Sequence, residues 1–145
     1  MTPEKYTESR TQLTYAGAAV AIEAAVAKSR ELKAPECIAV VDAATNLLAY
    51  ARVEGAAVLA KDPAIAKAAT AAALAMATGP IPFEFGVNLA EASHGSIVNL
   101  GGGLPIIADG RVLGAIGVGS GTTEQDVAVA EAGRDAILAL LGSRV

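Results

Sequence analysis

The sequence contains few of the residues from which metal and nucleophilic sites are usually built. It has one cysteine, one histidine and no tryptophan among 145 residues. A disulfide needs two cysteines, and zinc sites draw mainly on several cysteines and histidines. We therefore expect neither an intrachain disulfide nor a metal centre held by protein side chains.

Clustered positive charge and aromatic side chains are also scarce. The formal net charge is −4, and aromatic residues make up 3% of the chain. Proteins that bind nucleic acids obtain affinity from clustered lysine and arginine and stack bases on aromatic rings. Helices that lie on anionic membranes use a basic face. We expect neither nucleic acid nor a membrane as a partner.

No apolar leader follows the first methionine, because residues 1–10 include four charged side chains. An apolar stretch over residues 68–83 is shorter than the roughly 20 residues that cross a bilayer, and Gly79 and Pro80 interrupt it. We therefore expect a cytoplasmic protein. Residues 1–10 are expected to form an N-terminal lead, and residues 11–145 a single domain.

Apolar residues are abundant where charge is scarce. Hydrophobic residues make up 53% of the chain and charged residues 18%, against about 45–50% and about 25% in ordinary soluble domains. A small domain cannot hide such a surplus internally, so we expect a homo-oligomer with a large apolar interface. The alternative is that the surplus is alanine, which a surface tolerates.

The most informative segment is a glycine-rich stretch over residues 101–119. Its apolar runs flank Asp109 and Gly110, a pair typical of a type I′ hairpin turn. The following Thr122 and Gln125 have the spacing of a helix capping box. This segment therefore predicts two paired strands and the start of a final helix.

Helical and strand-like patterns alternate along the rest of the chain. We expect helices over residues 13–32, 63–78 and 125–141, a hairpin over residues 37–42 and 47–53, and a short strand over residues 96–100. Asp62 is expected to cap the middle helix, and Gly79 and Pro80 to end it. The prediction is a single α+β domain, with an antiparallel sheet of four to five strands flanked by helices.

Short motifs recur in a fixed order from about residue 13 to residue 141. They comprise residues 39–42, 51–56, 65–71, 102–106, 109–110 and 114–118, followed by Asp126, Ala130 and Gly133. Together they resemble the GlcG/HbpS family, which includes the C-terminal domain of PduO-type proteins. The resemblance implies a profilin-like sandwich that assembles into oligomers, and haem binding in some members.

Three positions depart from the family's pattern. Glu54 stands where an aspartate is usual, and Thr45 where a turn glycine is usual. Some haem-binding members use a histidine on the first helix as the axial ligand, and this first helix has none. Tyr15 is the residue there whose side chain could bind iron, so haem as a cofactor rests on Tyr15.

Three residues are candidates for catalysis. His94, the single histidine, could move a proton near neutral pH, or it could be a solvated imidazole before Gly95. Lys67 is the one charged residue between Pro63 and Thr78. It could be a nucleophile or bind a carboxylate, or it could form a salt bridge to Asp42 or Glu54. Glu54 is the third candidate, as a general base.

Other residues are candidates for ligand binding. Arg52 could bind a carboxylate through both guanidinium nitrogens, or it could form an ion pair between subunits. The backbone amides at Gly102, Gly103, Gly121 and Thr122 could hold an anion, and the last two lead into a helix. Tight turns and close packing are the alternative for these glycines.

Three functions fit these features. The first is an oligomeric protein that binds a small ligand, such as haem or a metabolite. The alternative is a small catabolic enzyme, a lyase, isomerase or hydrolase acting on a small carboxylate, with His94 or Glu54 moving a proton. The third is an accessory subunit whose charged residues form ion pairs between subunits.

Overall fold

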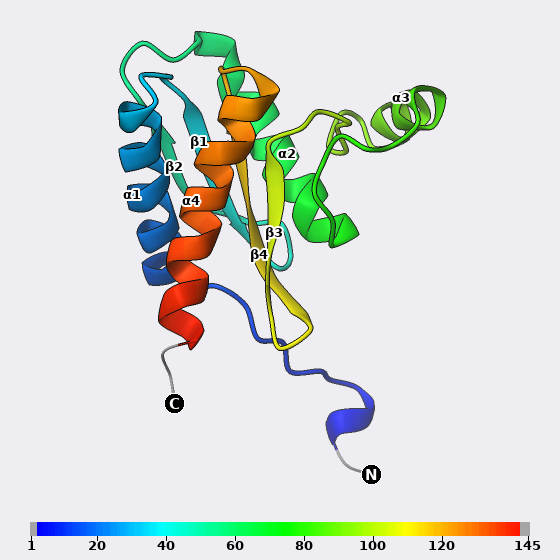
Figure 1. Ribbon diagram of the computed structural model, residues 1–145. Helices are drawn as coiled ribbons and strands as arrows, with labels where there is room; N and C mark the ends of the chain where they lie inside the picture. The colour runs from blue at the N-terminus through cyan, green and yellow to red at the C-terminus, as the bar shows by residue number, and fades with distance from the viewer. Residues whose placement is uncertain (1–2, 143–145) are drawn as a thin grey trace.

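The computed structural model describes residues 3–142 of the chain. Within that range it contains four α-helices and four β-strands (Figure 1). In chain order the elements are η1 (Pro3–Lys5), α1 (Tyr15–Glu31), β1 (Cys37–Asp42), β2 (Leu47–Arg52), η2 (Val58–Ala60), α2 (Lys61–Leu74), α3 (Phe83–Ala92), β3 (Gly103–Ala108), β4 (Arg111–Gly119) and α4 (Thr123–Gly142). Residues 1–2 of the expected lead and residues 143–145 of the expected domain lie outside the described residues.

The strands form one sheet in the order β2-β1-β4-β3, and every neighbouring pair is antiparallel. Helices α1 and α4 lie side by side over one face, and α2 covers the other (Figure 1). Helices therefore enclose β1 and β4, the two central strands, from both sides. The predicted α+β class and antiparallel sheet are confirmed.

The central strand β1 is buried along its whole length because both of its faces are covered. Ile38 and Val40 face the core beneath α1 and α4. Cys37, Ala39 and Val41 face the core beneath α2. This alternation explains why the sequence shows a continuous apolar run there.

Small residues bring α2 very close to the sheet. A Cβ atom on Gly117 of β4 would collide with the backbone oxygen of Ala64 and with Ala68 on the helix. The α2 face of the core accordingly consists largely of alanine. This close contact carries Lys67, on the same helix, into the interior.

Two local predictions are confirmed at the level of single residues. Asp109 and Gly110 have φ angles of 50° and 71°, as a type I′ turn requires. Thr122 and Gln125 form a reciprocal capping box, in which each backbone amide donates to the other side chain, at 2.9 and 3.2 Å.

The predicted cap and the predicted end of the middle helix are both wrong. Helix α2 begins at Lys61, directly after η2, and Asp62 lies in its first turn without capping it. The helix ends at Leu74 because Ala75 adopts a left-handed conformation, well before Gly79.

Residues 96–100 form no strand. Instead, the side chain of Thr70 fixes this segment along α2, because its hydroxyl donates to Ser96 and accepts from Val98.

Helix α3 stands apart from the sheet as an arm (Figure 1). Two hydrogen bonds between the Asn99 side chain and the Ile81 backbone, of 3.0 and 2.6 Å, tie the two ends of the arm together. Its phenylalanines, Phe83 and Phe85, are 81% and 58% exposed. The arm therefore presents an apolar surface to its surroundings.

Candidate functional site

A shallow groove of about 260 Å³ lies between α1 and β2. Its lining residues are Tyr15, Ala19, Ile22 and Glu23 from α1 and Ala49 and Tyr50 from β2. The four α1 residues share one face of the helix because they are spaced at three, four and seven positions. The floor of the groove is apolar, and Tyr15 and Glu23 supply its polar groups on the helix side.

The two tyrosines of the groove differ in their hydrogen bonding. The Tyr50 hydroxyl donates to Sγ of buried Cys37 at 3.3 Å, and burial with this contact raises the pKa of Tyr50 to about 12. Tyr15 is 69% exposed, and its hydroxyl has no partner among the described residues. Tyr15 therefore offers the groove an unoccupied phenolic oxygen.

A second cluster lies in the interior, near the end of β4. Lys67 Nζ donates to the backbone oxygen of Val118 at 2.7 Å and to Oδ2 of Asp126 at 2.9 Å. The side chains of Lys67 and Asp126 are 6% and 5% exposed. The salt bridge that stood as the alternative role of Lys67 therefore exists, but its partner is Asp126 and neither Asp42 nor Glu54.

Glu36 lies against this ion pair and is fully buried. Neither of its carboxyl oxygens has a hydrogen-bond partner among the described residues. Burial, reinforced by the negative charge of Asp126, raises the pKa of Glu36 to about 8. Glu36 is thus a carboxyl group that favours its protonated form near neutral pH.

Glycines close the loops around this cluster. The Gly121 amide donates to Oδ1 of Asp126 at 3.0 Å, and a Cβ atom at Gly121 would strike Glu36. The Gly103 amide donates to the Thr78 hydroxyl at 2.9 Å. A Cβ atom at Gly102 would lie 3.2 Å from Nζ of Lys67. These glycines allow the chain to approach the buried charges closely.

The Thr122 amide is likewise engaged, in the capping box. Because the amides of Gly103, Gly121 and Thr122 all donate to protein oxygens, these three predicted anion-binding residues are directed at the protein itself.

Arg52 and Glu54 lie at the far end of β2 and have local partners. Arg52 Nη2 donates to the backbone oxygen of Ala56 at 2.8 Å. Glu54 is fully exposed and pairs with Arg30 at 3.6 Å. A hydrogen bond from its own backbone and the charge of Arg30 lower the pKa of Glu54.

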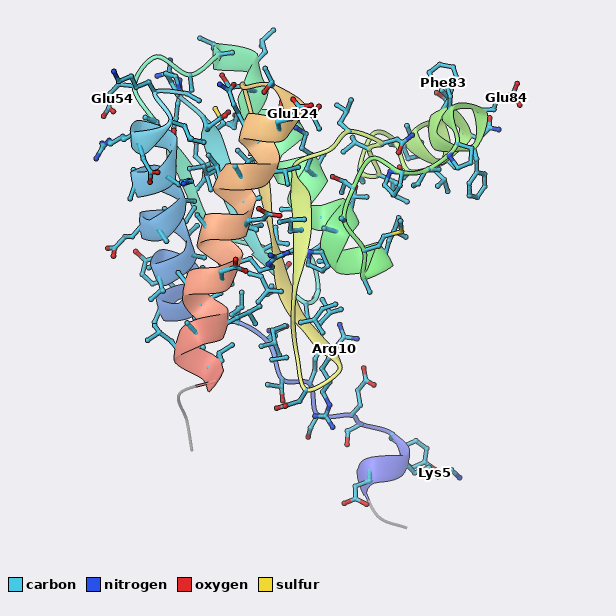
Figure 2. The ribbon with its side chains drawn as sticks, in the orientation of Figure 1. Lys5, Arg10, Glu54, Phe83, Glu84 and Glu124 are labelled. Atoms are coloured by element: carbon cyan, nitrogen blue, oxygen red, sulfur yellow. The ribbon has the colours of Figure 1, made fainter. Side chains whose placement is uncertain are left out.

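His94 ends the α3 arm, where it is exposed and has a φ of 54°. Figure 2 shows Glu54 and the arm at opposite sides of the molecule. Lys67 is enclosed between α2 and α4. The three candidate catalytic residues therefore do not converge on one reaction centre, and this arrangement does not favour the enzyme hypothesis.

Glu36 and Asp126 belong to a cluster that their sequence context does not reveal. Asp126 looks like an ordinary acidic residue in the first turn of a helix. Glu36 precedes an apolar strand and gives no local signal. Only the fold reveals their relation, because it brings together residues that lie far apart in the sequence.

Two larger open hollows, of about 490 and 610 Å³, lie at the end of the sheet that carries the β3–β4 turn. Both are lined by Thr11 and Arg111, and neither contains a predicted site residue. Over residues 3–142, no group of three or more metal-binding side chains comes together. Over the same residues, no helix has the length and apolar character needed to cross a membrane.

Comparisons with known proteins agree with this architecture. A family model described as haem degrading protein HbpS-like matches residues 13–135. A Citrobacter freundii protein, described as an uncharacterised 15.0 kDa protein of the dhaT-dhaS intergenic region, is 37% identical over 130 residues. The match covers 85% of this chain and 90% of that protein.

Solved structures give the same result. The crystal structure of Klebsiella pneumoniae ORFY matches with a TM-score of 0.84 and 30% identity, covering 92% of this chain and 95% of that one. A crystal structure of PduOC in complex with haem matches with a TM-score of 0.79 and 27% identity, covering 87% and 95%. The chain therefore belongs to the GlcG/HbpS family, whose members include proteins that bind haem.

Proposed function

We propose that the protein binds haem in the groove between α1 and β2, with the Tyr15 oxygen as the iron ligand. The observation that carries the proposal is the partnerless, exposed hydroxyl of Tyr15 beside an apolar groove. Haem iron is held by tyrosine in some proteins and by histidine in others. The lack of a histidine on α1 is therefore compatible with iron ligation at this position.

The chemistry of the groove suits a planar apolar ring. Ala19, Ile22 and Ala49 offer apolar surface to the groove, which Tyr15 and Glu23 also line. Tyr50 lines the β2 side of the groove, but its ring packs with the residues beneath α2 on the other face of the sheet, where its hydroxyl donates to Cys37. When bound, haem would supply an iron centre capable of electron transfer or of binding a further ligand.

The size of the groove supports a site shared between two copies of the chain. Its volume of about 260 Å³ lies below the roughly 300–1,000 Å³ of pockets that enclose a drug-sized ligand. One copy would therefore cover only one side of a haem group. In the proposed homo-oligomer, a second copy covers the other side.

The exposed apolar side chains of the α3 arm support the same assembly. Phe83 and Phe85 of α3, and Leu100 directly after the arm, are each more than half exposed. Large apolar patches on soluble proteins usually mark interaction sites. We propose that these side chains pack against another copy of the chain.

We also place the protein in the cytoplasm, where a single reduced cysteine such as Cys37 is ordinary.

The proposal is tested by titrating haemin into the wild-type protein, Tyr15→Phe and the matched control Tyr6→Phe. Tyr6 is also 69% exposed but lies outside the groove, on the N-terminal segment. We expect saturable binding in the wild type and in the control. In Tyr15→Phe, we expect affinity to fall by about tenfold or more, which corresponds to 1.4 kcal/mol or more.

The shape of the visible spectrum identifies the ligand independently of affinity. A tyrosine-ligated wild type should change its absorption bands when Tyr15 is replaced, and the control should not. Equal affinities and identical spectra for all three proteins would contradict ligation by Tyr15. A wild type that shows only unsaturable haemin adsorption would contradict haem binding itself.

A further inference from the structure

Three buried ionisable side chains meet where three elements converge. Glu36 immediately precedes β1, Lys67 lies on α2, and Asp126 lies in the first turn of α4. Each of the three residues is 5% exposed or less. Full ionisation would place two negative charges and one positive charge in the interior, which leaves an uncompensated negative charge.

The hydrogen bonds pair the positive charge of Lys67 with the carboxylate of Asp126. One oxygen of Asp126 accepts from Lys67 at 2.9 Å, and the other accepts from the Gly121 amide at 3.0 Å. Neither oxygen of Glu36 has a hydrogen bond of ordinary geometry within the described residues, and the facing Gly121 amide is already engaged by Asp126. A buried carboxylate without a donor is strongly unfavourable, whereas a protonated carboxyl group is not.

We propose that Glu36 and Asp126 together bind one proton, carried by Glu36 at neutral pH, so that the buried trio with Lys67 is electrically neutral. The groups that face the Glu36 carboxyl are Asp126 from α4, Lys67 from α2 and the Gly121 amide. Burial and Asp126 raise the pKa of Glu36 to about 8, while Gly121 and Lys67 act in the opposite direction.

This proton-binding site makes stability depend on pH in a defined direction. The folded protein retains the proton up to about pH 8, whereas an unfolded glutamate releases it near pH 4.5. The stabilising contribution is therefore complete below pH 4.5 and is lost progressively as the pH rises to about 8. Within this interval, the folding equilibrium constant should fall by about tenfold per pH unit.

Release of the proton also affects the loop between β4 and α4. It leaves two carboxylates facing each other beside Gly121, whose amide fixes the start of α4 to Asp126. The contact between the start of β1 and the start of α4 is then repulsive. The trio thus acts as a pH-sensitive contact that weakens under alkaline conditions.

The test measures urea unfolding between pH 5 and pH 8.5 for the wild type, Glu36→Gln and Glu131→Gln. The glutamine at position 36 keeps the shape of the side chain but cannot ionise. Glu131 is an exposed residue of α4 and provides the matched control. We expect the wild type and the control to lose stability as the pH rises. In Glu36→Gln, the folding equilibrium constant should depend less steeply on pH, by about tenfold per pH unit, because the proton on residue 36 is absent.

A second measurement covers the case in which Glu36→Gln fails to fold. Infrared spectroscopy of the wild type should show the carbonyl band of one protonated carboxyl group at pH 6.5, and this band should disappear above about pH 8. Absence of the band at pH 6.5 would overturn the proposal. Equal pH dependence of stability in the wild type and in folded Glu36→Gln would overturn it as well.

Discussion

Replacing Lys67 by methionine removes the positive charge of the buried cluster while keeping an unbranched, apolar side chain one atom shorter. The ammonium lies 2.9 Å from Asp126 and 2.7 Å from the Val118 oxygen, with both charged side chains almost fully buried. The variant leaves the Asp126 carboxylate beside the Glu36 carboxyl with no cation. Removing one partner of such a pair costs about 3–5 kcal/mol, against a total of about 5–15 kcal/mol for an ordinary domain.

Urea denaturation at pH 7 measures this loss directly. With a typical urea dependence of about 2 kcal/mol per molar, the midpoint should fall by about 2 M. The matched double variant, Lys67→Met with Asp126→Asn, removes both charges and keeps an oxygen for the Gly121 amide. The double variant should lose less free energy of unfolding, by about 1–3 kcal/mol, than the sum of the losses in Lys67→Met alone and Asp126→Asn alone.

Either of two results would contradict a strong interaction between Lys67 and Asp126. A loss below about 1 kcal/mol for Lys67→Met would mean that the pair behaves like an exposed salt bridge. Additive losses in the double variant would mean that the two side chains do not interact energetically in the folded protein.

Two further predictions concern the turn after β1 and the α3 arm. Thr45 has a φ of 67°, so Thr45→Gly should relieve about 1–2 kcal/mol of strain, offset by about 0.5–1 kcal/mol of chain entropy. Thermal unfolding of Thr45→Gly should show a free energy of unfolding higher by about 0.5–1 kcal/mol, a gain that Thr45→Ala does not share. A lower melting temperature for Thr45→Gly would contradict this expectation. The double change Phe83→Ser and Phe85→Ser should reduce the oligomer mass in analytical ultracentrifugation with little effect on the melting temperature, because both rings are exposed within one chain. An unchanged mass would contradict the proposed role of the arm, and Val58→Ser with Leu59→Ser serves as an exposed apolar control.

The sequence predicts those parts of the fold that depend on neighbouring residues. The turn at Asp109 and Gly110 and the capping box of Thr122 and Gln125 arise from chemistry within four positions of the chain. Such signals survive folding because few distant contacts compete with them. Where a distant contact does compete, as Thr70 does for residues 96–100, the local prediction of a strand is wrong.

The buried cluster could not be predicted because its chemistry depends on distance in space alone. Lys67 and Asp126 are separated by 59 positions, and their ion pair exists because the middle of α2 and the first turn of α4 meet near the end of β4. The sequence identifies Lys67 as unusual, since it is a single charge on an apolar helix. It gives no indication that Glu36 completes the group, since an acidic residue beside a strand is ordinarily solvated.

We propose above that Tyr15 ligates haem iron in the groove between α1 and β2. Resonance Raman spectroscopy of the haemin-loaded wild-type protein tests it most directly, because iron–phenolate vibrations identify the ligand atom. We expect phenolate bands that are absent from haemin-loaded Tyr15→Phe and retained in Tyr6→Phe. A spectrum of imidazole ligation, as His94 would give, or phenolate bands that survive the loss of Tyr15, would contradict ligation of the iron by Tyr15.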